Sequence, residues 1–344
     1  MSEIKVNNIQ GLEGSHGPEI SGISEMNSTG AMSLPRGDTT YRGGRGRGIF
    51  GGGRLGSNSS LMNNIEYITI ATTGDANDFG DLTVARRRVA GASSPTRGVF
   101  AGGYSPDKNE IDYITISATG NAFDFGDLIE ATRTMGGLSN EIRGLFGAGT
   151  VGAGAGIYQD RIDKITIATK GNASNFGNLT IARDGPAGVA SPIRGVLAGG
   201  YVAPSRVNVM DFVTIATEGN AEDFGDLTVS RSSGTSGGAN TTRGVFAGGY
   251  QPTGTAVDVI DYITIASKGD AIDFGNLTRV FGTFGGASNS IRAVWCGGYG
   301  QPAGYYANLE YITIATTGNA ASFGDLTSAR ASGGVCSDSH GGLG

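Results

Sequence analysis

The chain has 344 residues, of which 62 are glycine and nine are proline, and its net charge is −6. The glycines follow no Gly-X-Y period, which excludes collagen, and scattered Val, Ile, Phe and Tyr runs argue against disorder. No basic tract suits a nucleic-acid backbone, and no run of about 18 apolar residues suits a membrane span. We expect neither nucleic-acid binding nor membrane insertion.

Residues 1–44 stand apart from the rest of the chain. The phrase "IKVNNIQ" at 4–10 has the character of a short strand, and the stretch after it combines sparse apolar positions with many turn formers. The start lacks a charged segment followed by an apolar run, so no secretory signal is expected. Because 1–44 cannot bury a core alone, we expect an extended arm that docks on another surface.

From residue 45 onward the sequence repeats a unit of similar length six times. The phenylalanine of a "DFGDL"-type phrase marks each unit, at Phe79, Phe125, Phe176, Phe224, Phe274 and Phe323. Repeats of about 40–50 residues that contain several short β-like runs predict the blades of a propeller.

The unit around residues 91–127 shows four expected strands. A small-residue run at 91–94 is followed by "GVFAGG" at 98–103 and by "IDYITIS" at 111–117. A turn with Gly and Asn then leads to a fourth strand that begins at Phe125. No segment sustains a helical period. The sequence therefore predicts an all-β fold with four antiparallel strands per blade.

The two ends of the repeat complement each other. The last unit stops where its second strand should begin, and the first unit begins with a second strand at 48–53. We predict that residues 333–337 supply the innermost strand of the unit at 48–84, which removes an open sheet edge. The expected architecture is a six-bladed β-propeller over 45–344, closed by this C-terminal strand and preceded by the arm.

The repeat carries glycine pairs at 52–53, 102–103, 199–200, 248–249 and 297–298, and an arginine after the fourth strand at Arg86, Arg183, Arg231 and Arg330. In this pattern the chain resembles kelch-type propellers. The chain departs from this family in three ways. Phe replaces the tryptophan of the family, and Ala148 stands in place of the first glycine of a pair. Thr132 and Phe281 stand in place of the arginine after the fourth strand, which we call the late arginine. The resemblance implies a fold and says little about activity.

Charged residues recur in a fixed register. Each third strand carries an acid (Glu66, Asp112, Asp163, Asp211, Asp261, Glu310), and an arginine precedes each second strand (Arg47, Arg97, Arg143, Arg194, Arg243, Arg292). We expect structural ion pairs within each blade; a ring of metal or substrate ligands is the alternative. Sixfold repetition argues against catalysis, which needs side chains in different roles. The run 86–88, the densest basic cluster, is expected to be a solvated corner.

Two enzyme classes share this kind of fold. The phrase "NDFGDL" at 77–82 is faintly similar to the aspartate-box turn of sialidases, but its spacing to the aromatic differs and no arginine triad stands out. Copper oxidases with kelch-type repeats need histidine ligands, and this chain has only His16 and His340. We therefore expect no enzyme, no cofactor and no metal, and we expect Cys296 and Cys336 to be buried thiols.

Nearly all variation in unit length falls between the second and third strands, whose connections share one face of a propeller. These connections carry tyrosines, which suit contact with another surface or with sugars. The alternative is that a tyrosine after a glycine pair only covers the end of its blade. The candidate contact residues are Tyr104, Tyr158, Tyr201, Tyr250, Tyr299, Tyr305 and Tyr306.

The arm carries a second resemblance, through "IKVNNIQ" at 4–10, "ISGIS" at 20–24 and "STGAM" at 28–32. It looks like the leader of virion structural proteins from tailed phages of marine bacteria, especially cyanobacterial phages. The resemblance implies a non-enzymatic component of the phage tail or its fibres, made in the host cytoplasm. Residues 1–44 would bind other virion proteins in a symmetric homo-oligomer, and the loops would meet a host receptor, glycan or protein, or a neighbouring subunit. A lectin-like carbohydrate-binding propeller is the alternative, and a sialidase-like glycan hydrolase a weaker one.

Overall fold

The computed structural model of the protein describes residues 46–56, 60–152, 156–232, 236–282, 285–300 and 304–343. By its internal contacts the chain divides into Met1–Thr40 and Tyr41–Gly344, and every described residue belongs to the second unit. The arm expected at 1–44 therefore lies outside the described residues. Among the residues that the structure describes, no helix is long and apolar enough to cross a membrane.

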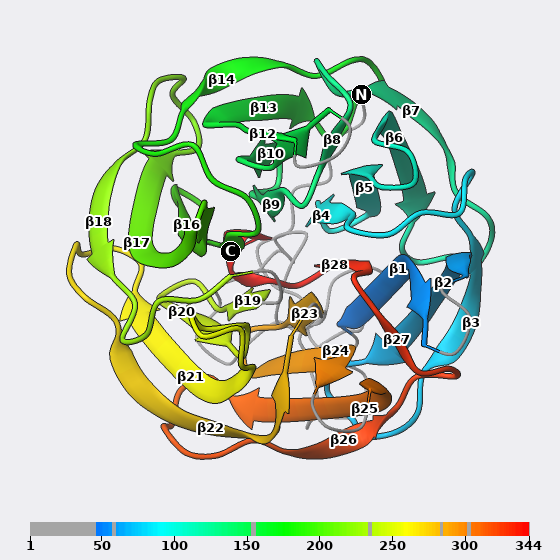
Figure 1. The fold of residues 1–344 in the computed structure, drawn as a ribbon. Coiled ribbons are helices and arrows are strands. Elements are labelled where there is room, and N and C mark those ends of the chain that lie inside the picture. Colours follow the sequence, from blue (N-terminus) through cyan, green and yellow to red (C-terminus); the bar gives the residue numbers. More distant parts are fainter. Residues whose placement is uncertain are drawn as a thin grey trace, which may run out of the picture. The chain divides into compact units, whose positions relative to one another are not determined.

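The described part of the chain is all-β, and its strands form successive antiparallel sheets (Figure 1). The first sheet contains β1 (Arg47–Leu55), β2 (Leu61–Thr69) and β3 (Asn77–Asp81), with β27 (Arg330–Ala331) and β28 (Gly334–Ser337) both paired to β1. Five four-stranded sheets follow, and the first two contain β4 (Ala90–Ser93), β5 (Arg97–Gly103), β6 (Lys108–Thr115) and β7 (Phe123–Asp127), and then β9 (Gly136–Ser139), β10 (Arg143–Gly147), β13 (Arg161–Thr166) and β14 (Ser174–Asn178). The next two contain β15 (Ala187–Ala190), β16 (Arg194–Val202), β17 (Ser205–Thr214) and β18 (Glu222–Asp226), and then β19 (Ser236–Ala239), β20 (Arg243–Ala247), β21 (Val257–Thr264) and β22 (Ile272–Phe281). The last contains β23 (Gly285–Ser288), β24 (Arg292–Gly300), β25 (Gly304–Thr313) and β26 (Ala321–Asp325).

Two small elements complete the description. A three-stranded sheet contains β8 (Thr132–Arg133), β11 (Thr150–Val151) and β12 (Ile157–Tyr158). The only helical element within the described ranges is the 3-10 turn η1 (Gly341–Leu343). The absence of a helical period in the sequence thus agrees with the structure.

The C-terminal strand pairs as the sequence predicts. Strand β28 lies antiparallel to β1, with Gly48 opposite Ser337 and Gly51 opposite Gly334. It therefore occupies the position beside β1 that β4 occupies beside β5. In β1, β5, β16 and β24 the register shifts at the glycine pair, which forms a bulge. In β5, Gly102 and Gly103 have φ values of 62° and 125°, which glycine adopts without strain.

The first strands of successive sheets lie against one another. Strand β4 contacts β9, β9 contacts β15, β15 contacts β19, β19 contacts β23, and β28 contacts both β23 and β4. Glycine permits this approach: a Cβ on Gly188 would overlap the carbonyl oxygen of Gly137, and one on Gly137 would overlap that of Gly91. Much of the unusual glycine content therefore serves close packing between backbones.

The core lies between neighbouring sheets. Each marker phenylalanine is buried and packs with apolar residues of the next sheet, as Phe125 does with Phe146 and Ile165. Phe323 of the last sheet packs in the same way with Phe50 and Ile70 of the first. These contacts account for the position of the phenylalanine in every repeat.

Backbone hydrogen bonds repeat the same pattern. The amide of Gly120 in one sheet donates to the carbonyl of Phe79 in the preceding sheet at 2.7 Å, and the amide of Gly74 donates to that of Phe323 at 2.8 Å. The last sheet is thus bonded to the first by the same contact that joins the others.

Two strand boundaries differ from expectation. The fourth strands begin two residues earlier than predicted, at Phe123 in one sheet. The expected connection between second and third strands that carries Tyr299, Tyr305 and Tyr306 is largely part of β24 and β25.

Candidate functional site

The acids of the third strands are buried in a network that joins neighbouring sheets. Asp112 on β6 lies 3.0 Å from the guanidinium of Arg86, which belongs to the connection between β3 and β4. It also accepts hydrogen bonds from the amide and hydroxyl of Thr83, at 3.1 and 2.6 Å. The same arrangement joins Arg183 to Asp211 at 3.1 Å, Arg231 to Asp261 at 2.9 Å and Arg330 to Glu66 at 3.5 Å.

These partners differ from the predicted ones. The expected pairs Arg97–Asp112, Arg143–Asp163, Arg194–Asp211, Arg243–Asp261 and Arg292–Glu310 do not form among the described residues. The strand register explains why: Arg97 lies opposite Thr115, whereas Asp112 lies opposite Phe100, three positions further along. Residues three apart on a strand point to opposite faces of the sheet, so the two charges cannot meet.

The arginines that precede the second strands bind backbone carbonyls instead. The guanidinium of Arg97 donates to the carbonyl of Ile167 in the next sheet at 2.7 Å and lies 4.5 Å from the centre of the Tyr113 ring. The other five donate in the same way, from Arg47 to Ile116, Arg143 to Ile215, Arg194 to Ile265, Arg243 to Ile314 and Arg292 to Ile70. These arginines therefore join neighbouring sheets and do not form the ion pairs expected within each blade.

The two units without the late arginine show what that residue does. Asp163 pairs with Arg161 at 2.7 Å because Thr132 stands in place of the arginine, and Glu310 binds the amide and hydroxyl of Thr278 where Phe281 stands. Burial raises the pKa of both Asp163 and Glu310. The late arginine thus places a buried positive charge beside the acid in four units. In the other two, Asp163 pairs with the partly exposed Arg161, and Glu310 has no ion-pair partner among the described residues.

The prediction of a solvated corner at 86–88 is wrong for its first residue. Arg86 is fully buried, because the repeat places it between two sheets as the partner of Asp112. Its Nε and one terminal nitrogen have no hydrogen-bond partner, and burial lowers the pKa of the guanidinium. Arg87 and Arg88 are only partly buried and lie beside Tyr104.

Most of the predicted contact tyrosines are interlinked at the end of the sheets where the second and third strands connect. Tyr158 and Tyr201 pack edge to face at 5.7 Å, and Arg206 lies 5.5 Å from the Tyr201 ring and 5.8 Å from the Tyr250 ring. The Tyr250 hydroxyl donates to the carbonyl of Tyr299 at 3.2 Å.

The same line of contacts continues beyond Tyr299. Tyr299 packs on Tyr305 at 5.2 Å, and the guanidinium of Arg54 lies 6.0 Å from the centre of the Tyr305 ring. We call the set Arg54, Tyr104, Tyr158, Tyr201, Arg206, Tyr250, Tyr299 and Tyr305 the tyrosine edge. The sequence pattern predicts the tyrosines of this edge but not its arginines. One available signal was that Arg54 occupies the position that tyrosine fills in four other units.

Tyr306 does not belong to the tyrosine edge. Tyr305 and Tyr306 are consecutive residues of β25 and so point to opposite faces of the sheet. Tyr306 packs on buried Phe281 at 5.5 Å and against the core between two sheets. It therefore acts in packing, and its prediction as a loop residue is wrong.

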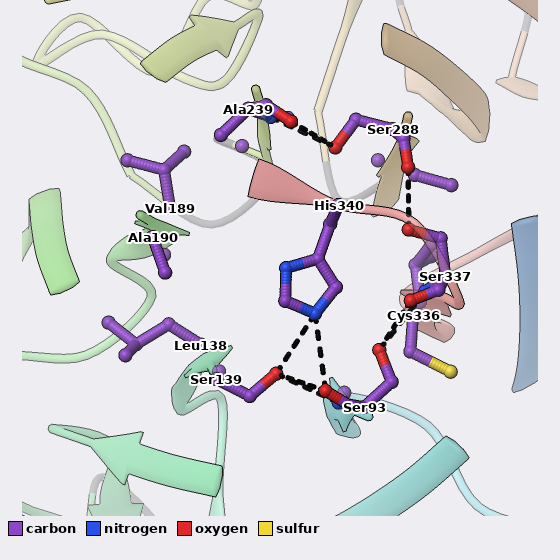
Figure 2. Close-up of a pocket in the computed structure, with 18 of the residues that line it drawn as sticks. Ser93, Leu138, Ser139, Val189, Ala190, Ala239, Ser288, Cys336, Ser337 and His340 are labelled. Atoms are coloured by element: carbon purple, nitrogen blue, oxygen red, sulfur yellow. Dashed lines mark hydrogen bonds between the residues drawn. The ribbon is translucent and has the colours of Figure 1, made fainter. Parts of the chain in front are cut away.

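A cavity of about 60 Å³ lies among the first strands, lined by small residues and by the C-terminal segment. Figure 2 shows a directional chain of serines around it: Ser139 donates to the carbonyl of Ser93, Ser93 to that of Ser337, Ser337 to that of Ser288, and Ser288 to that of Ala239, at 2.7–2.9 Å. Ala190 and Ala239 stand at the positions that serine fills in the other four innermost strands, so the chain of serine hydroxyls stops there. The turn η1 contacts the two strands that carry these alanines, β15 and β19.

His340 projects toward this cavity (Figure 2). Its Nδ1 accepts from the amide of Gly342 at 3.1 Å, so its Nε2 carries the proton and donates to the carbonyl of Ser93 at 3.2 Å. Burial lowers the pKa of His340 to about 4, which keeps the imidazole neutral at pH 7. The cavity admits water-sized groups and is far smaller than pockets of about 300 Å³ or more that hold small molecules.

The two cysteines are buried and unpaired, as predicted. Burial raises the pKa of each thiol to about 12, so neither is a thiolate at neutral pH. Within the described ranges, no group of three or more His, Cys, Asp and Glu side chains is placed to hold a metal ion. No protein-family model matches the chain, and no curated protein matches it.

Proposed function

We propose that the sheets are six blades of a closed, kelch-like β-propeller in which β28 completes the first blade. Three observations support the proposal. The first strands contact one another in an unbroken cyclic order, β28 pairs with β1, and the hydrogen bonds between consecutive sheets also join the last sheet to the first. In this architecture the tyrosine edge lies on a single face.

We further propose that the protein is a non-enzymatic structural and binding component of a tailed-phage virion, in the tail or its fibres. The observation that carries the binding role is the tyrosine edge, where side chains suited to recognition gather at the one place where the repeats differ in length. The repeated charges elsewhere are used in bonds between sheets. The edge would meet a host receptor or a neighbouring subunit.

The virion assignment is supported by the resemblance of residues 1–44 to phage structural leaders. In this proposal the arm binds other virion proteins and the propeller faces outward. An antibody against residues 46–343 tests it on particles purified from lysates in which the protein is made. Labelling of the tail supports the proposal, whereas intact particles that lack the protein, by labelling and by mass spectrometry, reject it.

A lectin-like module is the second candidate, because Tyr299 is 36% exposed and presents an aromatic ring on which a sugar can stack. A glycan array separates the two proposals, since a lectin would bind a defined neutral glycan without any virion. Tyr299→Ala should then abolish the signal, while Tyr306→Phe should leave it unchanged.

A further inference from the structure

Three arginines surround one tyrosine of the tyrosine edge. The guanidinium carbons of Arg87, Arg88 and Arg133 lie 5.0, 5.8 and 5.0 Å from the centre of the Tyr104 ring. All three residues come from connections between a fourth strand and the following first strand. We call Arg87, Arg88 and Tyr104 the arginine clamp.

Carboxylates balance only part of this positive charge. Arg133 pairs with Asp107 at 2.7 Å. Asp184 lies near Arg88 and Arg133: burial raises the pKa of its carboxyl group, and the positive charges of these two arginines oppose that rise. Among the described residues no carboxylate lies within ion-pair distance of Arg87 or Arg88.

The crowding of positive charge has an electrostatic consequence. Burial lowers the pKa of Arg87, and the positive charges of Arg88 and Arg54 lower it further. Like charges held together in this way repel each other, and the repulsion is relieved when an anion binds between them. In a chain of net charge −6, this local excess of arginine is unexpected.

The backbone holds the arginine clamp in place without needing its side chains. Arg87 and Tyr104 exchange backbone hydrogen bonds of 3.3 and 2.7 Å, and the amide of Arg88 donates to Ser332 at 2.6 Å. Arg88 has a φ of 59°, and glycine at 185 has the corresponding conformation, with a φ of 62°. Because glycine serves the fold equally well there, the arginine side chain at 88 needs a different explanation.

We infer that Arg87 and Arg88, backed by Tyr104, bind the carboxylate or sulfate groups of an acidic polysaccharide. Planar guanidinium groups match the paired oxygens of such anions. A polysaccharide fits better than an acidic peptide because the tyrosine edge offers further rings on which sugar rings can stack. The inference rests on the proposed binding role of this edge, but it does not depend on a virion location.

The test measures binding of the full chain to immobilised polygalacturonate and dextran sulfate, with neutral dextran and polyglutamate as further probes. We expect both acidic polysaccharides to bind, more weakly as NaCl increases, and neutral dextran to show no binding. Arg87→Gln with Arg88→Gln should raise the Kd by about tenfold or more, since hydrogen bonds to charged groups are strong. Lys268→Gln removes one positive charge at the opposite end of its sheet and should leave the Kd unchanged.

Arg88→Gly protects the test against misfolding, because it keeps the backbone conformation found at Gly185. This variant should melt as the unmodified protein does and still lose several-fold in affinity. The inference is overturned if neither acidic polysaccharide binds, if polyglutamate binds as tightly as they do, or if Arg88→Gly and Lys268→Gln have the same affinity. Since purified protein is used, none of these outcomes depends on whether the chain is found in virions.

Discussion

Neutralising Asp261 tests the buried charge network most cleanly. Asp261 and Arg231 are both fully buried, with 2.9 Å between their nearest atoms, and the Arg231 guanidinium also donates to the carbonyl of Phe246 at 3.2 Å. Asp261→Asn keeps the shape and one carbonyl oxygen but leaves Arg231 charged in the interior. Removing one partner of a buried ion pair costs about 3–5 kcal/mol, a large share of a typical stability of about 5–15 kcal/mol.

The assay is urea unfolding, followed by fluorescence and circular dichroism, with the slope of the transition held as a check on two-state behaviour. The matched control is Glu222→Gln, which removes the surface ion pair between Glu222 (69% exposed) and Lys268 (51% exposed). This change should lower the free energy of unfolding by at most about 1 kcal/mol. Adding Arg231→Met to Asp261→Asn should recover part of the loss, because the unpaired charge is gone. A cost for Asp261→Asn no larger than that of Glu222→Gln would refute the reasoning.

Three further predictions concern His340, Gly188 and the two cysteines. Because the pKa of His340 is lowered to about 4, its neutral form contributes stability that is complete above about pH 6.5 and is lost as the pH falls toward 4. The full loss is about 3 kcal/mol, and His340→Gln should remove this part of the pH dependence of the free energy of unfolding. Parallel plots of unfolding free energy against pH for the two proteins would contradict a lowered pKa at His340. Gly188→Ala should lower the melting temperature by many degrees or prevent folding, since its Cβ would overlap the carbonyl of Gly137, and an unchanged melt would exclude that contact. Cys296 and Cys336 should resist a thiol reagent at pH 8 in the native protein and react fully in denaturant; rapid reaction of either native thiol would contradict its burial.

Much of the fold could be predicted from the repeat. The spacing of the phenylalanines, the glycine pairs and the missing strands at the two ends predicted antiparallel four-stranded sheets and the pairing of 333–337 with the first of them. These features are local, and each has one simple physical solution. The outer strand boundaries were predicted less well, because β24 and β25 extend past the repeated phrases.

The partners of the charged residues could not be predicted with the same success. The arginine and acid of one repeat looked like natural partners, but Arg97 and Asp112 occupy opposite faces of their sheet. The true partner, Arg86, comes from the preceding unit, and contacts between units cannot be read from a repeat considered alone. The different roles of Tyr305 and Tyr306 follow from strand alternation, which became evident only once their segment proved to be a strand.

Amide hydrogen exchange in β28 tests the central claim, that the C-terminal strand completes the first sheet. Strand β15, Ala187–Ala190, occupies the same position in another sheet and serves as the internal standard. The structure predicts that amides of Gly334–Ser337 exchange as slowly as those of β15 and lose protection together with it in denaturant. Fast exchange of Gly334–Ser337 in a protein whose β15 remains protected would contradict the claim.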